Sequence, residues 1–421
     1  MRILWVTAQQ LPYVADELKI KKEGFGGWIM NMIMQLKELP DVHIGIAMSY
    51  PKVNRLKKVV DNITCYVVED PGGKSITDRE RDWIISDFQP DIIHIEGSEF
   101  AIQNMFTKAD FKPIILSLQG ILSGYEAYQY GGLPIADYMY SRKAKNIISS
   151  WILYFRKHLK FENRIPMETE AIANVCYLTG RTFWDRAHSF YINNSAQYFA
   201  CNRILRPLFY QKKWSVNECE KHTIFVGNGY SPLKGLHFVI DALSCLKGQF
   251  PDVKLYVAGV SPIETNKKSV KYYGYSNIIR KKIKKLKLEE NIIFLGALLE
   301  EEMIEYMLKA KVFVLPSLIE NSPNTLGEAM LMGIPCVSSY VGGVGDMATD
   351  EVECLYYRSN DPILCAWQIK RIFEDEELAV SLSQRAQKRA AVTHDPILNR
   401  DALMNAYQHM LEENKDVENE K

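Results

Sequence analysis

The chain alternates short apolar runs with longer segments whose apolar residues recur at helical spacing. The runs RILWVT, HIGIAM, ITCYVV, DIIHIE and PIILSLQG are typical of buried strands, and GGWIMNMIMQLKEL is typical of an amphipathic helix. From about residue 221 the alternation begins again with HTIFVGNG, LHFVIDALSCLKG, VKLYVAGV and NIIFLGAL, and it continues to IPCVSSYVGG. Strands that alternate with helices in this way predict parallel sheets with helices on both faces. We therefore predict an α/β chain with two doubly wound domains.

The boundary between the two domains is predicted near residue 210. An aromatic-rich stretch that contains Pro207 separates the two alternating regions, which gives domains over 1–210 and 211–395. The pattern over 396–415 predicts a C-terminal helix that can pack back on the first domain. Because open α/β sheets bind ligands beyond the carboxyl ends of their strands, we expect the active site between the domains.

Length and composition support this organisation and exclude some functions. The 421 residues exceed the ~250 at which single hydrophobic cores stop growing. The 51 basic and 51 acidic residues balance, which argues against a nucleic-acid partner. The eight cysteines show neither paired nor metal-ligand spacing, and the chain opens directly as a strand without a signal-like segment. We expect a reduced, cytoplasmic protein without a membrane-spanning segment.

The stretch LIENSPNTLGEAM, residues 318–330, is the strongest candidate for a binding loop. VFVLPSL reads as a strand and NTLGEAMLMG as a helix, so residues 316–323 form the loop between them. Ser322 is the expected N-cap, and Pro323 the expected first helical residue. The N–H groups of Asn324 and Thr325 would then point outward at the positive end of the helix dipole. This arrangement predicts an anion site that suits a phosphate.

Two carboxylates flank this loop. Glu320 precedes the expected cap, and Glu328 lies about a turn and a half into the helix with its side chain tilted back toward the start. Carboxylates accept hydrogen bonds from vicinal hydroxyls. A ligand with a phosphate between two hydroxyl-rich groups, such as a nucleotide sugar, would therefore suit both the anion site and the two carboxylates. The alternative is that the helix dipole alone favours acidic residues there.

Two further loops precede helices. After TIFVGNG, Ser231 and Pro232 repeat the cap-and-proline pattern, and Lys234 follows in the first turn, where a cation indicates an anion to neutralise. A solvated surface lysine is the alternative. In GFGGW, residues 24–28, glycines permit either close approach to a ligand or tight packing of the following helix.

The stretch ENSPNTLGEAMLMGIPCVSSYVGG, residues 320–343, resembles the donor-site signature of retaining glycosyltransferase family 4, the group 1 glycosyltransferases of GT-B fold. The resemblance extends back through NIIFLGAL and FVGNGYSPLKGL, so it covers most of the second domain. It implies two Rossmann-like domains that face each other across an interdomain cleft. It also implies a retaining transfer of a hexosyl unit from a nucleoside diphosphate sugar to a saccharide or lipid-linked saccharide, in bacterial surface polysaccharide synthesis. A nucleotide-sugar hydrolase or epimerase of the same fold, and a catalytically silent sugar-binding protein, are the alternatives.

The resemblance also implies a role for individual residues. Glu328 would hold the ribose, Glu320 would lie beside the transferred sugar, and Lys234 would neutralise the departing diphosphate. The base would lie against Leu298, and the glycine loop of the first domain would close over the donor. The donor-binding residues implied are Gly26, Gly27, Asn228, Lys234, Leu298, Asn321, Ser322, Asn324, Thr325, Leu326 and Glu328.

Two positions depart from the family pattern. Many members carry an arginine where this chain has Asn228, and a histidine where the first-domain loop SLQG places Gln119. Gln119 can hydrogen-bond a sugar hydroxyl but cannot carry a proton near neutral pH. No strand ends in a DxD pair, and Lys234 can neutralise the diphosphate instead. We therefore expect no metal and no cofactor, with the nucleoside diphosphate sugar as donor substrate.

Two first-domain residues are secondary candidates. His94 ends the run DIIHIE and is a second candidate for catalysis, although a histidine at a strand end can be purely structural. Arg181 in LTGRTFWDRA is a candidate for binding donor or acceptor, and a structural pair with Asp185 is the alternative.

The stretch 141–164 combines basic residues with Trp151, Tyr154 and Phe155. Such a helix can lie on anionic lipid at the inner face of the membrane, which would suit a lipid-linked acceptor. The alternative is a helix that packs its aromatic residues into the first domain while its basic residues stay solvated.

Overall fold

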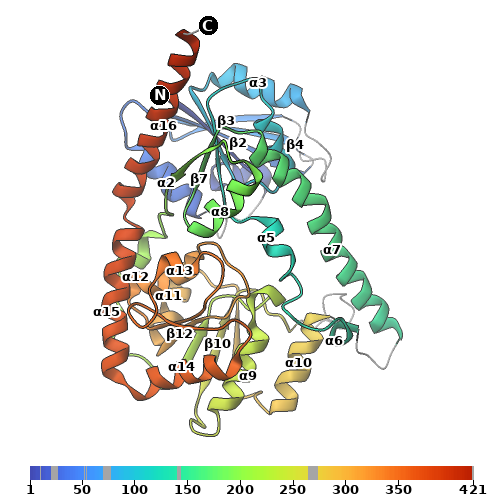
Figure 1. Ribbon diagram of the computed structural model, residues 1–421, viewed down its shortest axis with the longest axis vertical. Helices are drawn as coiled ribbons and strands as arrows, with labels where there is room; N and C mark the ends of the chain where they lie inside the picture. Colours follow the sequence, from blue (N-terminus) through green and yellow to red (C-terminus); the bar gives the residue numbers. More distant parts are fainter. Residues whose placement is uncertain are drawn as a thin grey trace. The chain divides into compact units, whose positions relative to one another are not determined.

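The computed structural model describes residues 1–9, 11–19, 27–51, 53, 55–69, 77–139, 144–263 and 274–419. The chain divides into two compact units (Figure 1). Unit 1 consists of residues 1–124, 162–206 and 394–421, and unit 2 consists of 125–161 and 207–393. Our sequence-based boundary treated 1–210 as one domain, whereas the structure assigns 125–161 to unit 2 and separates the units at 206/207.

Unit 1 contains an eight-stranded sheet in the order β3-β4-β2-β1-β5-β6-β7-β8. Its strands are β1 Arg2–Thr7, β2 His43–Tyr50, β3 Leu56–Val60, β4 Ile63–Glu69, β5 Ile92–Glu96, β6 Ile114–Ser117, β7 Tyr177–Gly180 and β8 Gln197–Ala200. Every neighbouring pair is parallel except β3 and β4. The predicted parallel sheet is confirmed for the strands proposed from the sequence, and the antiparallel edge strand β3 is an addition to that prediction.

Successive apolar side chains of β1 point to opposite faces of this sheet, so both faces need helices to cover them. Ile3 and Trp5 join a buried cluster with residues of α2 (Gly27–Lys37) and α16 (Pro396–Asn419). Leu4 and Val6 point to the other face, into a cluster with residues of α3 (Asp78–Phe88) and α4 (Ala101–Thr107). The C-terminal helix α16 packs along α2, so the predicted return of this helix to the first unit is observed (Figure 1).

The remaining helical elements of unit 1 are short. They are η1 Pro12–Val14, α1 Ala15–Leu18 and α8 Phe183–Ile192. Two helices each contain a position at which the chain passes from one unit to the other. They are α5 Leu122–Glu126 and α7 Ala144–Ala173.

Unit 2 contains a six-stranded parallel sheet in the order β11-β10-β9-β12-β13-β14. Its strands are β9 Thr223–Val226, β10 Lys254–Ala258, β11 Ile292–Gly296, β12 Val312–Leu315, β13 Cys336–Ser339 and β14 Leu355–Tyr357. Its helical elements are α6 Ile135–Met139, η2 Pro207–Tyr210, η3 Pro232–Lys234, α9 Leu236–Leu246, α10 Tyr275–Leu286, α11 Glu300–Lys309, α12 Asn324–Met332, α13 Val344–Met347, α14 Pro362–Glu374 and α15 Glu376–Thr393. Strand order reverses between β9 and β12, and such a switch point is where doubly wound sheets bind ligands.

Candidate functional site

The loop after β12 holds Glu320 in a buried ion pair at the switch point. Glu320 is only 6% exposed, and its Oε1 lies 2.5 Å from Nζ of Lys234. The hydroxyl of Ser317 donates to the same oxygen over 2.7 Å. Lys234 ends η3, in the loop after β9, so the two neighbouring strands deliver the two charges to one place. The structure thus brings together the carboxylate and the cation that the sequence singled out separately.

Backbone contacts fix the loops that carry this pair. The N–H of Leu318 donates to the carbonyl of Leu233 over 2.9 Å, and the N–H of Gly343 donates to the carbonyl of Glu320 over 3.0 Å. A Cβ at Gly235, where φ is 71°, would lie 1.9 Å from the carbonyl oxygen of Pro316. Only glycine permits this approach, because any side chain would overlap the backbone. The loop with Lys234 is therefore locked against the loop with Glu320.

Helix α12 begins one residue later than the sequence predicted. Pro323 is the N-cap, with ψ 118°, and Asn324 is the first helical residue. The prediction of Ser322 as the cap is wrong: no side chain caps this helix, and the Ser322 hydroxyl contacts Sδ of Met347 at 3.8 Å. Because the ψ of Pro323 is extended, the helical backbone begins at Asn324. The predicted end is confirmed, since Gly333 follows the last helical residue with φ 75°.

The start of α12 still offers backbone donors. The N–H of Leu326 donates to the carbonyl of Pro323 over 3.1 Å, and within the described residues no acceptor is found for the N–H groups of Asn324 and Thr325. A Cβ at Gly227 would lie 3.3 Å from Cγ2 of Thr325, which places the β9 loop beside this helix start. The N–H groups of Asn324 and Thr325 are therefore open to a ligand at the positive end of the helix, whereas that of Leu326 is already bonded.

The other predicted residues of unit 2 lie in the loops that follow β9, β11 and β12 and in α12. Asn321 and Glu328 are buried, at 1% and 3% exposure. The Oδ1 of Asn228 accepts from the N–H of Tyr230 over 3.0 Å, so the amide that replaces the expected arginine shapes its own turn. Leu298 lies half-buried in the loop between β11 and α11. The roles assigned to these residues stay predictions.

In unit 1, Gln119 lies beside a buried carboxylate that the sequence analysis did not single out. Its Nε2 donates to Oε1 of Glu96 over 3.2 Å. Glu96 is 1% exposed and pairs with Arg203, whose guanidinium also donates to Oε1. Although burial opposes ionisation, the adjacent Arg203 and hydrogen bonds hold the pKa of Glu96 well below its usual range. Gln119 is therefore positioned by a charged group at the end of β5.

His94 lies in the same interior. Its ring stacks on Trp5 with centroids 3.9 Å apart, and Nδ1 lies 2.7 Å from the hydroxyl of Tyr407. Burial lowers the pKa of His94, so the imidazole is neutral near pH 7. Its Nε2 has no hydrogen-bond partner within the described chain and lies 3.6 Å from Oε2 of Glu96. These contacts match the structural alternative considered for this residue, and a catalytic role stays a prediction.

Arg181 supports the loop that carries Gln119. Its guanidinium donates to the carbonyls of Leu118 over 2.5 Å and of Gln119 over 3.0 Å. Its contact with Asp185 is made by the backbone N–H, at 3.0 Å, rather than by the guanidinium. Burial lowers the pKa of Arg181 to about 10, which leaves it charged at pH 7. The structural pair with Asp185, considered as the alternative for Arg181, is thus a backbone contact rather than a pair of side chains, and a role in binding donor or acceptor stays a prediction.

The glycine loop is described only in part. Gly27 opens α2, and a Cβ there would lie 3.8 Å from Cγ of Arg206. Gly26 lies outside the described residues, as do residues 141–143 of the basic stretch.

Within the described ranges, no group of three or more His, Cys, Asp or Glu side chains is arranged to hold a metal ion. There, too, no helix combines the length and the apolar character that crossing a bilayer requires. The expectation that no metal is needed stays a prediction.

Three residues that contact the predicted site residues were not identified from the sequence, namely Ser317, Glu96 and Arg203. Ser317 stands three residues before Glu320 and carries no signal beyond lying in the same loop. Glu96 is an acidic residue inside a fully buried strand pattern, which is a signal that it needs a partner. Arg203 lies 107 residues further along the chain, so nothing local could identify it as that partner.

Comparison with known proteins addresses the second unit most directly. Residues 209–389 match the sequence profile of the family Glycosyl transferases group 1. Residues 209–389 form a group 1 glycosyltransferase domain. This glycosyltransferase domain contains Lys234, Glu320 and the start of α12, so the geometry described above lies within the matched region.

A curated relative is similar over less than half of the chain. N-acetyl-alpha-D-glucosaminyl L-malate synthase of Bacillus anthracis is 25% identical over 178 residues, which are 42% of this chain and 42% of that protein. The chain is thus aligned with less than half of the length of this relative.

Solved structures resemble the whole chain. Sucrose-phosphate synthase from Thermosynechococcus elongatus has a TM-score of 0.70 at 15% identity, over 97% of this chain and 98% of that one. HepE of Anabaena, solved in complex with UDP-glucose, has a TM-score of 0.67 at 15% identity, over 97% and 100%. The chain therefore has the GT-B fold that the resemblance implied, with the glycosyltransferase domain in unit 2.

Proposed function

We propose that the protein is a retaining glycosyltransferase. It moves a hexosyl unit from a nucleoside diphosphate sugar to a saccharide or lipid-linked saccharide acceptor in bacterial surface polysaccharide synthesis. The observation that carries the proposal is the Lys234–Glu320 pair at the β9/β12 switch point, beside the open amides of Asn324 and Thr325. Group 1 family membership of the domain and the UDP-glucose complex of HepE support the donor class.

In the proposed reaction, the diphosphate lies against the start of α12 and Lys234. The bond between the anomeric carbon and the diphosphate breaks, a bond from an acceptor hydroxyl forms on the same face, and the hydroxyl proton passes to a donor phosphate oxygen. Charge builds on the leaving diphosphate, where fixed donors and a cation lower the barrier most. When the donor binds, Lys234 must share its charge between Glu320 and the diphosphate. Glu320 then faces the positive charge that develops on the sugar.

The donor is tested first by thermal stability. UDP, GDP and ADP hexoses are screened, because a ligand that binds the native state raises its apparent stability. The proposal predicts that one nucleotide class raises the melting temperature and that Glu320→Gln retains this shift but loses turnover. No shift with any donor, in protein that is folded by circular dichroism, would contradict the donor site.

Turnover then distinguishes the proposed reaction from the alternatives. Transfer with retention gives an acceptor-dependent product whose new linkage has the anomeric configuration of the donor, as measured by NMR. Release of free sugar at a rate independent of acceptor would identify a hydrolase, and a changed donor sugar would identify an epimerase. A thermal shift without any turnover would identify a silent sugar-binding protein.

A membrane contact is the second part of the proposal, and α7 supports it. Ile148, Trp151, Ile152, Phe155 and Leu159 are exposed by 60%, 41%, 41%, 52% and 50%. They recur every three or four residues and so form one apolar stripe along the helix. This differs from the alternative in which the aromatic residues pack inward. Among the described residues, Tyr154 is the one of Trp151, Tyr154 and Phe155 that stacks on a ring outside the helix, that of Tyr130 at 4.3 Å.

Charge favours an anionic lipid surface as the partner of this stripe. Arg156 and Lys160 are exposed and adjoin the stripe along one edge, as expected for an amphipathic helix in a membrane interface. The protein would then work at the inner face of the membrane, near a lipid-linked acceptor. This placement is a proposal from surface chemistry.

Liposome flotation at low salt tests the contact. We expect binding to vesicles that contain phosphatidylglycerol, weaker binding at high salt, and loss of binding in the double variant Phe155→Ser/Leu159→Ser. The matched control is Ile397→Ser/Leu398→Ser, which removes two apolar side chains of similar exposure from α16. Equal binding by both double variants would refute α7 as the contact.

A further inference from the structure

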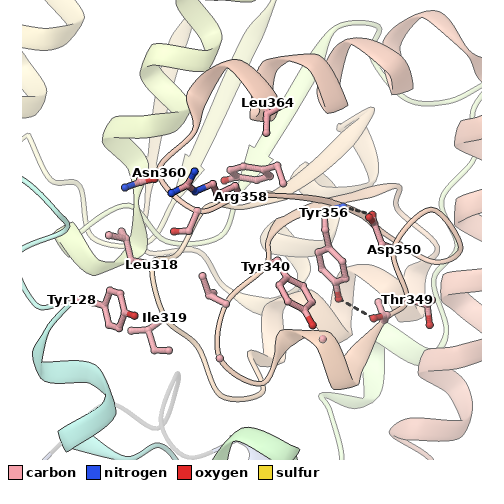
Figure 2. A pocket seen from close by; sticks show the side chains of 16 residues that line it. Tyr128, Leu318, Ile319, Tyr340, Thr349, Asp350, Tyr356, Arg358, Asn360 and Leu364 are labelled. Carbon is pink, nitrogen blue, oxygen red and sulfur yellow. Dashed lines mark hydrogen bonds between the residues drawn. The ribbon is translucent and has the colours of Figure 1, made fainter.

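Unit 2 contains a large pocket beside the candidate donor site. It lies at the carboxyl ends of β12, β13 and β14, and its volume is about 1040 Å³. This is at the upper end of the ~300–1,000 Å³ usual for small-ligand sites. Figure 2 shows Arg358 and Asn360 on one side of it and Tyr128 and Tyr340 on the other. The pocket therefore has room for a ligand larger than one sugar ring.

Some lining groups build the wall and are already engaged. The Oδ1 of Asp350 accepts from the N–H of Tyr356 over 2.8 Å and from that of Glu351 over 3.0 Å. The hydroxyl of Tyr356 hydrogen-bonds the carbonyl of Val344 over 2.8 Å. Asp350 and Tyr356 thus serve the fold of this wall rather than a ligand.

Other lining groups are presented to the pocket. The Tyr340 side chain is 63% exposed and meets Tyr356 edge to face, with centroids 5.3 Å apart. Tyr128 is 41% exposed, and Arg358 and Asn360 are exposed as well. The pocket thus combines two accessible aromatic rings with a planar guanidinium and a planar amide.

This combination fits a neutral saccharide better than other ligands. Sugar rings present an apolar face that packs on aromatic rings, and hydroxyls that pair with planar donors and acceptors. A phosphate-rich ligand calls for several cations, whereas Arg358 is the lone Lys or Arg among the described lining residues and Asp350 lies across the same pocket. A lipid chain calls for an apolar lining throughout, whereas the charged and polar side chains of Asp350, Arg358 and Asn360 line this pocket beside its aliphatic residues.

The pocket is continuous with the loop that carries Glu320. Leu318 and Ile319 line it and directly precede Glu320. Gly342 also lines it, and a Cβ there would lie 2.0 Å from the Glu320 carbonyl oxygen. A saccharide in the pocket would therefore extend toward the place where the sugar is transferred.

We propose that this pocket is a saccharide subsite that holds a neutral oligosaccharide portion of the acceptor, away from the unit that receives the new sugar. The proposal rests on the proposed transferase function. It adds that affinity for the acceptor increases with chain length and that Tyr340 and Arg358 determine this increase.

Oligosaccharide binding tests the proposal without the reaction. The probes are neutral gluco- and manno-oligosaccharides of increasing length, from a single unit upward, measured by saturation-transfer NMR and titration calorimetry. We expect longer members of one series to bind, and Tyr340→Ala to weaken that binding by about 3- to 10-fold, as expected for one lost aromatic contact. Arg358→Ala provides a second exposed variant in the same pocket. Tyr191→Ala is the control, because Tyr191 is 89% exposed on α8 in unit 1.

Nucleotide-sugar thermal shifts are measured on the same variants. We expect these shifts to stay at the wild-type value in Tyr340→Ala and Arg358→Ala. If both variants lose the nucleotide shift, the pocket belongs to the donor site and the proposal fails. If no oligosaccharide binds, or all variants bind like the wild type, the saccharide subsite is refuted while the donor site stands. A failure of the proposed function would instead show as no nucleotide shift in the wild type.

Discussion

Replacing Lys234 by methionine should separate activity from stability. Lys234 keeps 30% of its side chain exposed whereas Glu320 keeps only 7%, so removal of the lysine leaves a buried carboxylate whose remaining side-chain partner among the described residues is Ser317, and should lower the free energy of unfolding by about 1–3 kcal/mol. If Lys234 neutralises the departing diphosphate, the loss of one such group should lower kcat by about 10²- to 10³-fold. The measurements are nucleoside diphosphate release, with the donor that gives the largest thermal shift, and urea unfolding.

A matched variant controls for the loss of a charge. Lys309 in α11 pairs with Glu305 at the same 2.5 Å, on the surface of the same unit. Lys309→Met removes an exposed pair, so it should change stability by at most about 1 kcal/mol and leave turnover at the wild-type level. A loss of kcat of less than about tenfold in Lys234→Met, which is below 1.4 kcal/mol of barrier, would refute neutralisation by this lysine. A loss of stability above about 3 kcal/mol together with wild-type turnover of the folded protein would indicate that Lys234 is mainly structural.

Three further outcomes are expected. Burial raises the pKa of Glu168 from 4.5 to about 7, so wild-type stability should fall as the pH rises between these values, because the carboxyl ionises in the unfolded chain but stays protonated in the folded protein. Glu168→Gln should remove this loss in urea unfolding at pH 5 and 8. Gly235→Ala should lower the free energy of unfolding by about 1–3 kcal/mol and weaken the donor thermal shift, whereas Gly248→Ala, which meets nothing within 4 Å, should do neither. Arg203→Met should lower the free energy of unfolding by about 3–5 kcal/mol, because Glu96 stays buried without its cation, and Glu96→Gln in the same chain should restore part of it.

The sequence was most informative where local pattern decides structure. Buried strands and amphipathic helices follow from spacing, so the parallel strands around β1 and β12 were predictable. Lys234 and Glu320 were predictable as separate candidates because each lies in a loop between a strand and a helix. Their direct ion pair depends on the order of β9 and β12 in the sheet, which spacing alone does not determine.

The assignment of residues 125–161 to unit 2 was not predictable in the same way. It depends on tertiary contacts such as that between Nε2 of His237 and the carbonyl of Gly131, at 3.0 Å. Burial lowers the pKa of His237 to about 3, so the ring is neutral and Nε2–H donates in this bond. The sequence marks neither residue as a partner of the other. The same holds for Tyr128 and Tyr340, which are far apart in sequence and line one pocket.

The path of the chain has a consequence for how this protein can be divided. It passes between the two units four times, at 124/125, 161/162, 206/207 and 393/394. Neither unit is therefore encoded by one uninterrupted stretch of the gene, and a C-terminal truncation at any position before 393 removes part of both. Synthesis from the N-terminus leaves unit 1 without α16 until all residues of unit 2 have been made, so His94 gains its contact with Tyr407 only after that. Nonsense or frameshift mutations within unit 2 or α16 should thus damage the core of the unit whose synthesis begins first.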